Sequence, residues 1–168
     1  MLTLVGIALV VLFLGFVVVP ALIVIVPPGS AYVVERLGRY RGTLDPGFNM
    51  IVPLVDRVAH RHSLALQTEE LSELCTTKDQ RRILIAASFR LRVLDSRRAA
   101  YGSADYRQFI RENVRMLQNR SVDSVDWDFL RENSRWLESE VLKHLGEPAE
   151  TVGVAVLEYE VRSLEESV

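Results

Sequence analysis

The chain has 168 residues, with 20 Lys and Arg against 22 Asp and Glu and a formal net charge of −2. This length is typical of one domain plus an attached segment, and the charge balance does not favour nucleic acid as a partner. The single cysteine, Cys75, excludes an internal disulfide framework and a zinc cluster built from cysteines.

Residues 1–26 carry no charged side chain and are predicted to form a membrane segment. As a helix they would extend roughly 39 Å, more than the roughly 30 Å hydrocarbon core of a bilayer. The alternatives are a removed signal peptide and a buried core helix, but a signal peptide usually has a basic start and a shorter apolar run. The residues of this segment expected to contact lipid are Leu12, Phe13, Phe16, Pro20 and Ile23.

Pro20 complicates the geometry of this segment, because a proline inside a helix removes one backbone hydrogen bond and predicts a kink or a break. The segment is then either a tilted, kinked span or a re-entrant hairpin, and the sequence does not choose between them. The positive-inside tendency places the C-terminal domain on the cytoplasmic face. The membrane itself is expected to be of the bacterial inner-membrane type. The basic residues that follow the segment and give this orientation are Arg36, Arg39, Arg41 and Arg57.

Residues 27–56 are predicted to form a membrane-proximal hairpin and turn region. Ala31–Leu37 is rich in β-formers, Gly38 permits a turn, and Tyr40 returns along the first strand. Pro46 and Gly47 predict a second turn, with a positive φ at the glycine. The apolar run that follows either lies against the bilayer or packs into the domain core; its lipid-contacting candidates are Phe48, Ile51, Val52, Pro53 and Leu54.

Residues 57–164 are predicted to form the main domain, followed by a tail at 165–168. Alternation over Arg82–Val93 predicts a half-buried strand, with the buried face made of Ile83, Ile85, Ala87, Phe89, Leu91 and Val93. Arg82, Ser88, Arg90 and Arg92 fall on its other face.

The period becomes helical from about Ser96 to Gly146 and predicts two helices. The second is expected to begin at the N-cap Asp126 and to stop at Gly146, which Pro148 follows. A last strand is expected to pair beside Arg82–Val93, with Leu157, Tyr159 and Val161 facing one way. Strands followed by helices predict an α+β fold with an antiparallel-rich sheet and packed helices.

Three small clusters carry groups capable of chemistry, and each has a simpler interpretation. His60 and His62 would share one face of a strand, but no third metal ligand stands at a helpful spacing, which favours a basic surface or a protonatable pair near headgroups. Cys75 lacks a neighbouring base and is interpreted as a bystander. Glu158 and Glu160 are interpreted as a solvated strand face. The sequence therefore predicts no catalytic, cofactor-binding or metal-binding residue and a protein that is not an enzyme.

Several motifs together resemble the SPFH domain, named for stomatin, prohibitin, flotillin and their bacterial relatives, and most closely its stomatin-like branch. They are the hairpin "RLGRY" at Arg36–Tyr40, the "PGF" turn at Pro46–Phe48, the "IVPLVD" run at Ile51–Asp56, "TKD" at Thr77–Asp79 and the late "VGVAVLEYEVRSL" strand. The resemblance spans about residues 26–164. Two departures are a region reading "LQTEELSELC", where the family usually has a Pro-Pro-Gln-type stretch, and the absence of the family's long Ala/Glu-rich helix before Val168.

The resemblance implies a non-enzymatic membrane scaffold without a cofactor, which oligomerises laterally and organises a membrane microdomain or modulates membrane partners such as channels and membrane-bound proteases. It implies that Arg36, Arg39 and Arg41 face lipid headgroups or neighbouring subunits. The expected partners are the bilayer and a ring-like oligomer with itself or a longer SPFH relative. One alternative is an accessory regulatory subunit of a membrane enzyme such as a protease. A membrane-tethered enzyme is a further alternative, which only the histidine pair motivates.

Overall fold

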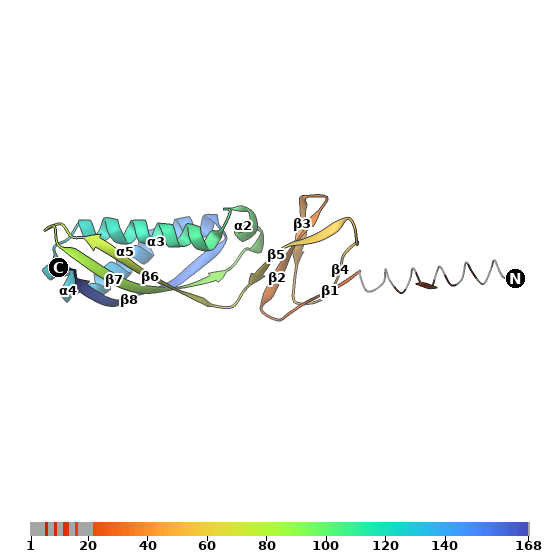
Figure 1. Cartoon of the computed structure of the whole chain (residues 1–168), viewed down its shortest axis with the longest axis horizontal. Helices are drawn as coiled ribbons and strands as arrows, with labels where there is room; N and C mark the ends of the chain where they lie inside the picture. The colour runs from red at the N-terminus through yellow and green to blue at the C-terminus, as the bar shows by residue number, and fades with distance from the viewer. Residues whose placement is uncertain (1–5, 7–8, 10–11, 14–15, 17–21, 168) are drawn as a thin grey trace. The chain divides into compact units, whose positions relative to one another are not determined.

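The computed structural model describes residues 6, 9, 12–13, 16 and 22–167, and these separate into two compact units (Figure 1). Unit 1 is Met1–Ser63 and unit 2 is Leu64–Val168. Unit 1 holds short strands, whereas unit 2 combines strands with packed helices, and every strand pair in the described part of the chain is antiparallel. The predicted α+β class with an antiparallel-rich sheet is confirmed.

Unit 1 contains two small sheets. In the first, β1 (Ile23–Val26) pairs with β4 (Gly47–Met50); in the second, the order is β3 (Arg39–Leu44), β2 (Ser30–Arg36), β5 (Asp56–Ser63). The predicted hairpin is confirmed, and its two-residue turn has positive φ at Leu37 (51°) and Gly38 (79°). Gly47 also has the expected positive φ, at 117°.

The structure moves two of the predicted segment boundaries. Residues 23–26, expected at the end of the membrane segment, form β1 because they pair residue by residue with β4. The boundary expected between residues 56 and 57 lies instead after Ser63, because the whole of β5 pairs with β2. The predicted segment over residues 1–26 otherwise falls mainly outside the described residues.

Unit 2 is built on the sheet β6 (Gln67–Thr76), β7 (Arg82–Val93) and β8 (Val154–Glu166), with β7 in the centre. Its helices are α2 (Ser96–Tyr101), α3 (Tyr106–Asp123), α4 (Trp127–Glu132) and α5 (Ser134–Thr151). Helices α3 and α5 cover one face of this sheet (Figure 1). The predicted pairing of the last strand with Arg82–Val93 is confirmed.

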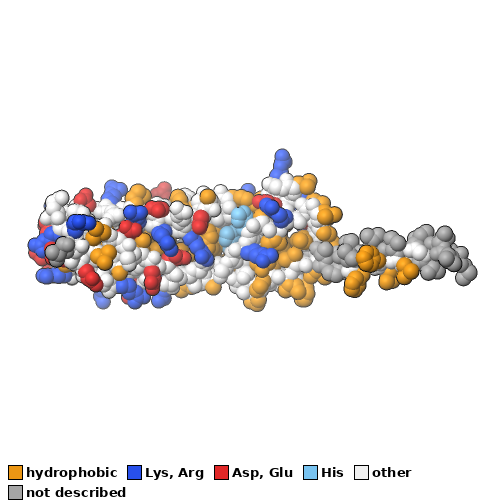
Figure 2. Space-filling view, in the orientation of Figure 1, with side chains coloured by type: hydrophobic (Ala, Val, Ile, Leu, Met, Phe, Trp, Pro, Cys, Tyr) orange, Lys and Arg blue, Asp and Glu red, His pale blue; other side chains and the backbone are white. Residues whose placement is uncertain are grey.

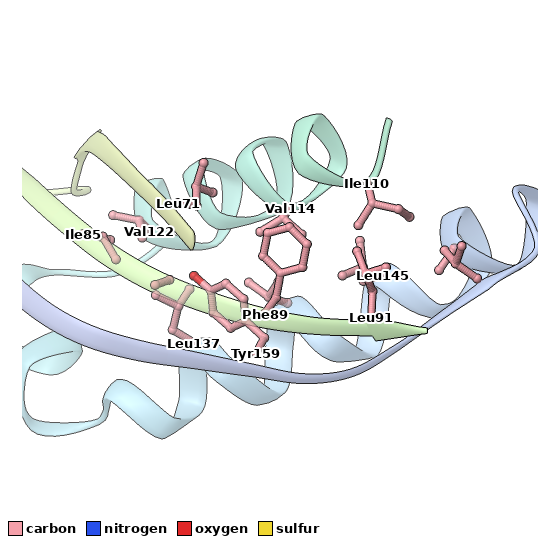
Figure 3. Close-up of a cluster of buried hydrophobic side chains, with 14 of the residues drawn as sticks. Leu71, Ile85, Phe89, Leu91, Ile110, Val114, Val122, Leu137, Leu145 and Tyr159 are labelled. Carbon is pink, nitrogen blue, oxygen red and sulfur yellow. The ribbon is translucent and has the colours of Figure 1, made fainter. Parts of the chain in front are cut away.

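The core of unit 2 lies between the sheet and these helices. All six β7 residues of the predicted buried face are buried, and Figure 3 shows Phe89 and Leu91 among side chains from α3 and α5. Each fully buried side chain of this size stabilises the fold by about 1.5–3 kcal/mol. Ser88, expected on the solvent face, is buried because Arg162 covers it and donates from Nε to the Ser88 hydroxyl at 3.1 Å.

A buried polar chain crosses this core. The Tyr159 hydroxyl of β8 donates to Gln118 Oε1 of α3 at 2.7 Å, and Gln118 Nε2 donates to Cys75 Sγ of β6 at 3.3 Å. Burial raises the pKa of both the Cys75 thiol and the Tyr159 phenol, so both groups remain protonated near neutral pH. Each polar group thus has a partner despite its exclusion from water.

The "TKD" motif ties the β6–β7 turn to the start of α4. Thr77 Oγ1 donates to Asp79 Oδ1 at 2.5 Å. Asp79 Oδ1 also accepts a hydrogen bond from the Trp127 backbone N–H at 3.2 Å. The hydrogen bond from Thr77 is the largest cause that lowers the pKa of Asp79, and the hydrogen bond from the Trp127 N–H lowers it further. Asp126 occupies the expected N-cap position of α4 but makes no side-chain capping bond, so Asp79 satisfies this helix terminus instead.

The helix expected to run from Asp126 to Gly146 is in fact two helices. It breaks at Asn133, and α5 then continues through Gly146 and Pro148 to Thr151, so the predicted stop is wrong. The extra turn persists because Ala149 lies in the core. The end comes at Gly153, whose φ of 68° is the left-handed conformation in which helices commonly terminate.

Strand β8 corrects two further expectations. Leu157 does not face the same way as Tyr159, because Arg90 pairs with Glu158 and Leu91 with Val156; Leu157 is therefore the extra residue of a bulge and is exposed. Residues 165–166, expected in a tail, belong to β8 because they pair with the start of β7.

We predict that Gly153→Ala destabilises unit 2 by about 2–4 kcal/mol. A Cβ at this positive-φ position would lie 2.5 Å from the Asp95 carbonyl oxygen and 2.6 Å from Arg98 Cβ. Chemical unfolding followed by tryptophan fluorescence measures this unit, because both tryptophans, Trp127 and Trp136, belong to it.

The matched control is Gly146→Ala, which lies inside α5 with nothing within 4 Å of an added Cβ. It is expected to stabilise unit 2 by about 0.5–1 kcal/mol, since alanine loses less backbone entropy than glycine in a helix. Equal unfolding free energies for the two alanine variants would contradict the assigned role of Gly153.

Candidate functional site

The β1–β4 sheet of unit 1 exposes a face made of large apolar side chains. In the ladder Ile23 pairs with Met50 and Ile25 with Phe48, and directly opposite residues of an antiparallel pair project to the same face. We call this face the apolar ribbon: Ile23, Ile25, Phe48 and Met50, which are 46%, 62%, 83% and 71% exposed. Figure 2 shows hydrophobic side chains gathered over this part of unit 1, beside basic ones.

The ribbon is unusual because the opposite face of the same two strands already supplies the contacts with the rest of unit 1. Val26 is almost fully buried, and Val24 and Asn49 are half-buried. A soluble surface carries scattered apolar side chains, but a contiguous set of this kind marks an interaction site. The ribbon is therefore the candidate functional site of unit 1.

Two exposed turns lie beside each other in the same unit. Leu37 stands in the β2–β3 turn, Leu54 stands in the turn between β4 and β5, and the Leu37 backbone N–H donates to the Val55 carbonyl oxygen at 3.1 Å. We call Leu37 and Leu54 the apolar tips; they are 80% and 103% exposed. Leu54 lies four residues after the end of β4, so the chain passes from a ribbon strand to a tip within a few residues.

A buried carboxylate, Asp56, holds these turns in place. Arg36 donates to it in bidentate fashion, from Nε to Oδ1 at 2.7 Å and from Nη2 to Oδ2 at 3.1 Å. Arg41 Nη1 also donates to Oδ2, as does the Val52 backbone N–H at 2.8 Å. The hydrogen bond from Arg36 is the largest cause that lowers the pKa of Asp56 to about 2, with the Val52 N–H and the charges of both arginines adding to it.

The hairpin remains basic in spite of this carboxylate. The Asp56 side chain is inaccessible to water, whereas those of Arg36 and Arg41 are 43% and 39% exposed. Arg39 is exposed beside Arg36, its ladder partner, and makes no ion pair within the described part of the chain. Among Arg36, Arg39 and Arg41, two thus form ion pairs with the single carboxylate Asp56. That these arginines face headgroups or subunits remains a prediction.

The structure places the other predicted lipid-contacting residues in different settings. Leu12, Phe13 and Phe16 are helical and exposed, while Pro20 lies outside the described residues. Ile23 and Phe48 come together in the ribbon, and Val52 and Leu54 are exposed near it; Ile51 and Pro53 are half-buried. Among the helices that the structure describes, none combines the length and apolar character needed to span a bilayer.

The alternative that residues 48–55 pack into a core is not what the structure shows, because Phe48, Met50, Val52 and Leu54 are all exposed within the chain. Exposed and half-buried residues alternate from Phe48 to Val55, through β4 and the turn that follows it, so the apolar side chains at every second position are exposed. Asn49 turns toward the unit, where its side chain donates to the backbone carbonyl of Asp45 at 2.8 Å.

The structure places the chemically capable residues in these settings. The rings of His60 and His62 stack with centroids 6.0 Å apart, and no group of three or more His, Cys, Asp or Glu in the described part of the chain is arranged to hold a metal ion. Cys75 is buried. Glu158 and Glu160 form ion pairs with Arg90 and Arg162, each at 3.1 Å.

Sequence reasoning missed four residues of this site. Asp56 was part of a recognised motif, but its partners stand 15 and 20 residues earlier, so only the arginines across the hairpin hinted at it. Ile25 was hidden inside a uniformly apolar run. Met50 alternates with Phe48, which was a usable signal, and Leu37 stood beside a turn glycine.

A model described as the SPFH domain / Band 7 family matches residues 24–167. The chain belongs to this family. The SPFH match covers nearly all of the described chain of both units, which confirms the resemblance carried by the motifs, including the stomatin-like branch.

Among its relatives, the stomatin-like protein 2, mitochondrial, of Rattus norvegicus and that of Homo sapiens are each 26% identical over 145 residues. The alignment covers 84% of this SPFH chain and 40% of each relative, so the chain spans about two fifths of their length. An uncharacterized protein of Methanocaldococcus jannaschii is 27% identical over 150 residues, covering 89% of this chain and 75% of the relative.

We predict that acid loosens the turn that Asp56 holds. Because the pKa of Asp56 is lower in the folded chain than its ordinary value of 3.8, the carboxylate stabilises the fold fully above about pH 4, and this contribution is lost as the pH falls through about 2. Hydrogen exchange at the Val52 amide, corrected for its intrinsic rate, should show protection disappearing over this interval.

The variant Asp56→Asn should give weak Val52 protection at every pH, whereas Asp45→Asn, which removes an exposed carboxylate of the same unit, should keep the original profile. Unchanged Val52 protection in Asp56→Asn would show that the carboxylate does not hold the turn.

Proposed function

We propose that this protein is a non-enzymatic, membrane-associated scaffold subunit of the stomatin-like SPFH type, with unit 1 lying against the bilayer through the apolar ribbon. The observation that carries the proposal is the exposed ribbon face of Ile23, Ile25, Phe48 and Met50. Membership of the SPFH family supports membrane association at the family level.

A comparison of free energies favours apolar contact over charge as the main attachment of unit 1 to the membrane. Full burial of a large apolar side chain stabilises by about 1.5–3 kcal/mol, so four such side chains are worth on the order of 6 kcal/mol or more. A basic residue near an anionic membrane surface adds only about 1 kcal/mol, and salt screens it. Arg36, Arg39 and Arg41 would then orient unit 1 at the headgroups, while the ribbon supplies most of the affinity.

The part of the predicted membrane segment that precedes β1, residues 1–22, belongs to the same proposal. It would tether the chain to the bilayer, and the ribbon that follows it would hold unit 1 at the membrane surface on the cytoplasmic face. A tether raises the effective concentration of the ribbon at the lipid surface, so even moderate ribbon affinity gives a docked unit.

Lateral assembly is the second part of the proposal. The chain would form a ring-like oligomer with itself or with a longer SPFH relative and thereby organise a membrane microdomain or modulate a membrane protease or channel. The support for this part is family membership. The alternative, an accessory subunit, requires one specific membrane enzyme as a partner. Co-purification from native membrane distinguishes it from the scaffold. A complex that contains only SPFH chains would contradict the accessory subunit.

Docking predicts a lipid environment around position 48. In the full chain reconstituted into vesicles, a polarity-sensitive fluorophore attached through Phe48→Cys should emit at the shorter wavelengths typical of an apolar environment. The matched control carries the label through Ser72→Cys on an exposed position of unit 2 and should emit as in water. A Cys75→Ser background removes the native thiol and keeps an acceptor for Gln118.

Water-like emission at position 48 would contradict the docking of unit 1. Emission should also change little between low and high salt, because the attachment is mainly apolar. Complete loss of the blue shift in salt would show that the arginines, and not the ribbon, hold unit 1.

Assembly predicts a large particle after gentle detergent extraction, with several copies of the chain or of an SPFH relative. Imaging of the native complex gives its copy number and its components. A monomer in near-native lipid would contradict the scaffold part of the proposal while leaving the docking of unit 1 open to its own measurement.

A further inference from the structure

The two apolar tips have an unfavourable backbone conformation. Within the described residues, three positions other than glycine have positive φ: Leu37 at 51°, Leu54 at 71° and Gln80 at 63°. The left-handed region is strained for residues with a Cβ, and glycine, asparagine or aspartate usually occupies it. In a two-residue hairpin turn with positive φ at both positions, Asn-Gly is the common pair, yet this chain has Leu37 followed by Gly38.

Side-chain packing does not offset the backbone strain of these leucines. Leu37 is 80% exposed and Leu54 is 103% exposed, so neither side chain contributes to the core of unit 1. Strained residues persist where the surrounding structure enforces them, and they cluster at functional sites. Here the enforcing contacts are the hydrogen bond from Leu37 N–H to the Val55 carbonyl at 3.1 Å and the Asp56 carboxylate, which binds Arg36 and the Val52 N–H.

We propose that Leu37 and Leu54 are paired wedges that enter the acyl-chain region of an anionic bilayer, while Arg36, Arg39 and Arg41 bind the phosphates above them. This inference rests on the proposed docking of unit 1 and adds the residues that penetrate deepest. Rigid turns with exposed leucine apices insert without the ordering cost that a flexible loop would carry.

Charge identifies the occupant as anionic lipid. Arg36 and Arg39 flank Leu37 directly, Arg41 lies two positions further along β3, and Asp56 is the only carboxylate that an ion pair joins to these arginines within the described residues. The neighbouring Arg57 and Glu35 pair with each other at 3.3 Å. Exposed leucine side chains next to arginine side chains match a bilayer, in which acyl chains lie below phosphates.

The first arm of the experiment measures stability. Leu37→Asn and Leu54→Asn should each raise the protection of unit 1 amides against hydrogen exchange by roughly two- to tenfold, because asparagine tolerates positive φ better than leucine. Gln80→Asn is the matched control: the same relief of strain at an exposed turn of unit 2. A loss of protection at the leucine positions would show that the leucines support the fold, and would overturn the proposal.

The second arm measures depth in the membrane. The full chain carrying Leu37→Trp or Leu54→Trp is reconstituted into vesicles of phosphatidylglycerol and phosphatidylcholine whose acyl chains are brominated. The tryptophan fluorescence at each tip, after subtraction of the unsubstituted chain, should be quenched strongly by bromine and weakly by aqueous iodide. Gln80→Trp should show the reverse. The asparagine substitution at the other tip should reduce the bromine quenching.

A third tryptophan position separates this inference from the docking on which it rests. If Phe48→Trp is quenched by brominated lipid and the two tips are not, the ribbon docks and the wedge proposal is overturned alone. If neither position is quenched, both fail. Tips shielded from iodide without bromine quenching would identify a protein neighbour, such as a second copy, and would equally overturn insertion into lipid.

Discussion

The buried carboxylate of Asp56 joins the end of β2, the strand β3 and the turn before β5 through Arg36, Arg41 and the Val52 N–H. A charge without access to water is tolerated only when it is paired and hydrogen-bonded, so these contacts are required together. A guanidinium carries five N–H donors, and Asp56 uses only some of them. The same arginines can therefore organise unit 1 and still offer donors to an external anion.

The sequence predicted best those elements whose pattern is strong and local. The alternation in β7 identified its buried face, and glycine and proline located both turns of unit 1. It failed where a distant contact decides the local structure. Leu157 is displaced by the pairing of β8 with β7, and Pro148 remains inside α5 because the following residue packs into the core, so neither outcome follows from the residue itself.

The candidate site was only partly visible for a related reason. Within a uniformly apolar run, nothing distinguishes Ile23 and Ile25 from Val24 and Val26 until the pairing with β4 assigns them to opposite faces. The ribbon combines β1, which precedes the β2–β3 hairpin in the chain, with β4, which follows it. The tips are distinguished by the positive φ of Leu37 and Leu54. The composition of the run shows how many apolar side chains it has, but only the β1–β4 pairing shows which face of the sheet each one occupies.

The order of strands in unit 2 also bears on how the newly made protein reaches its fold. The central strand β7 ends at Val93, but its second neighbour, β8, begins only at Val154, after all four helices of this unit. While translation proceeds, one edge of β7 therefore has no partner, and Tyr159 is not yet present to meet Gln118. Contacts so far apart in sequence close slowly, and an unpaired strand edge is prone to incorrect association. Nascent chains held on neighbouring ribosomes are thus most vulnerable to mispairing just before β8 emerges.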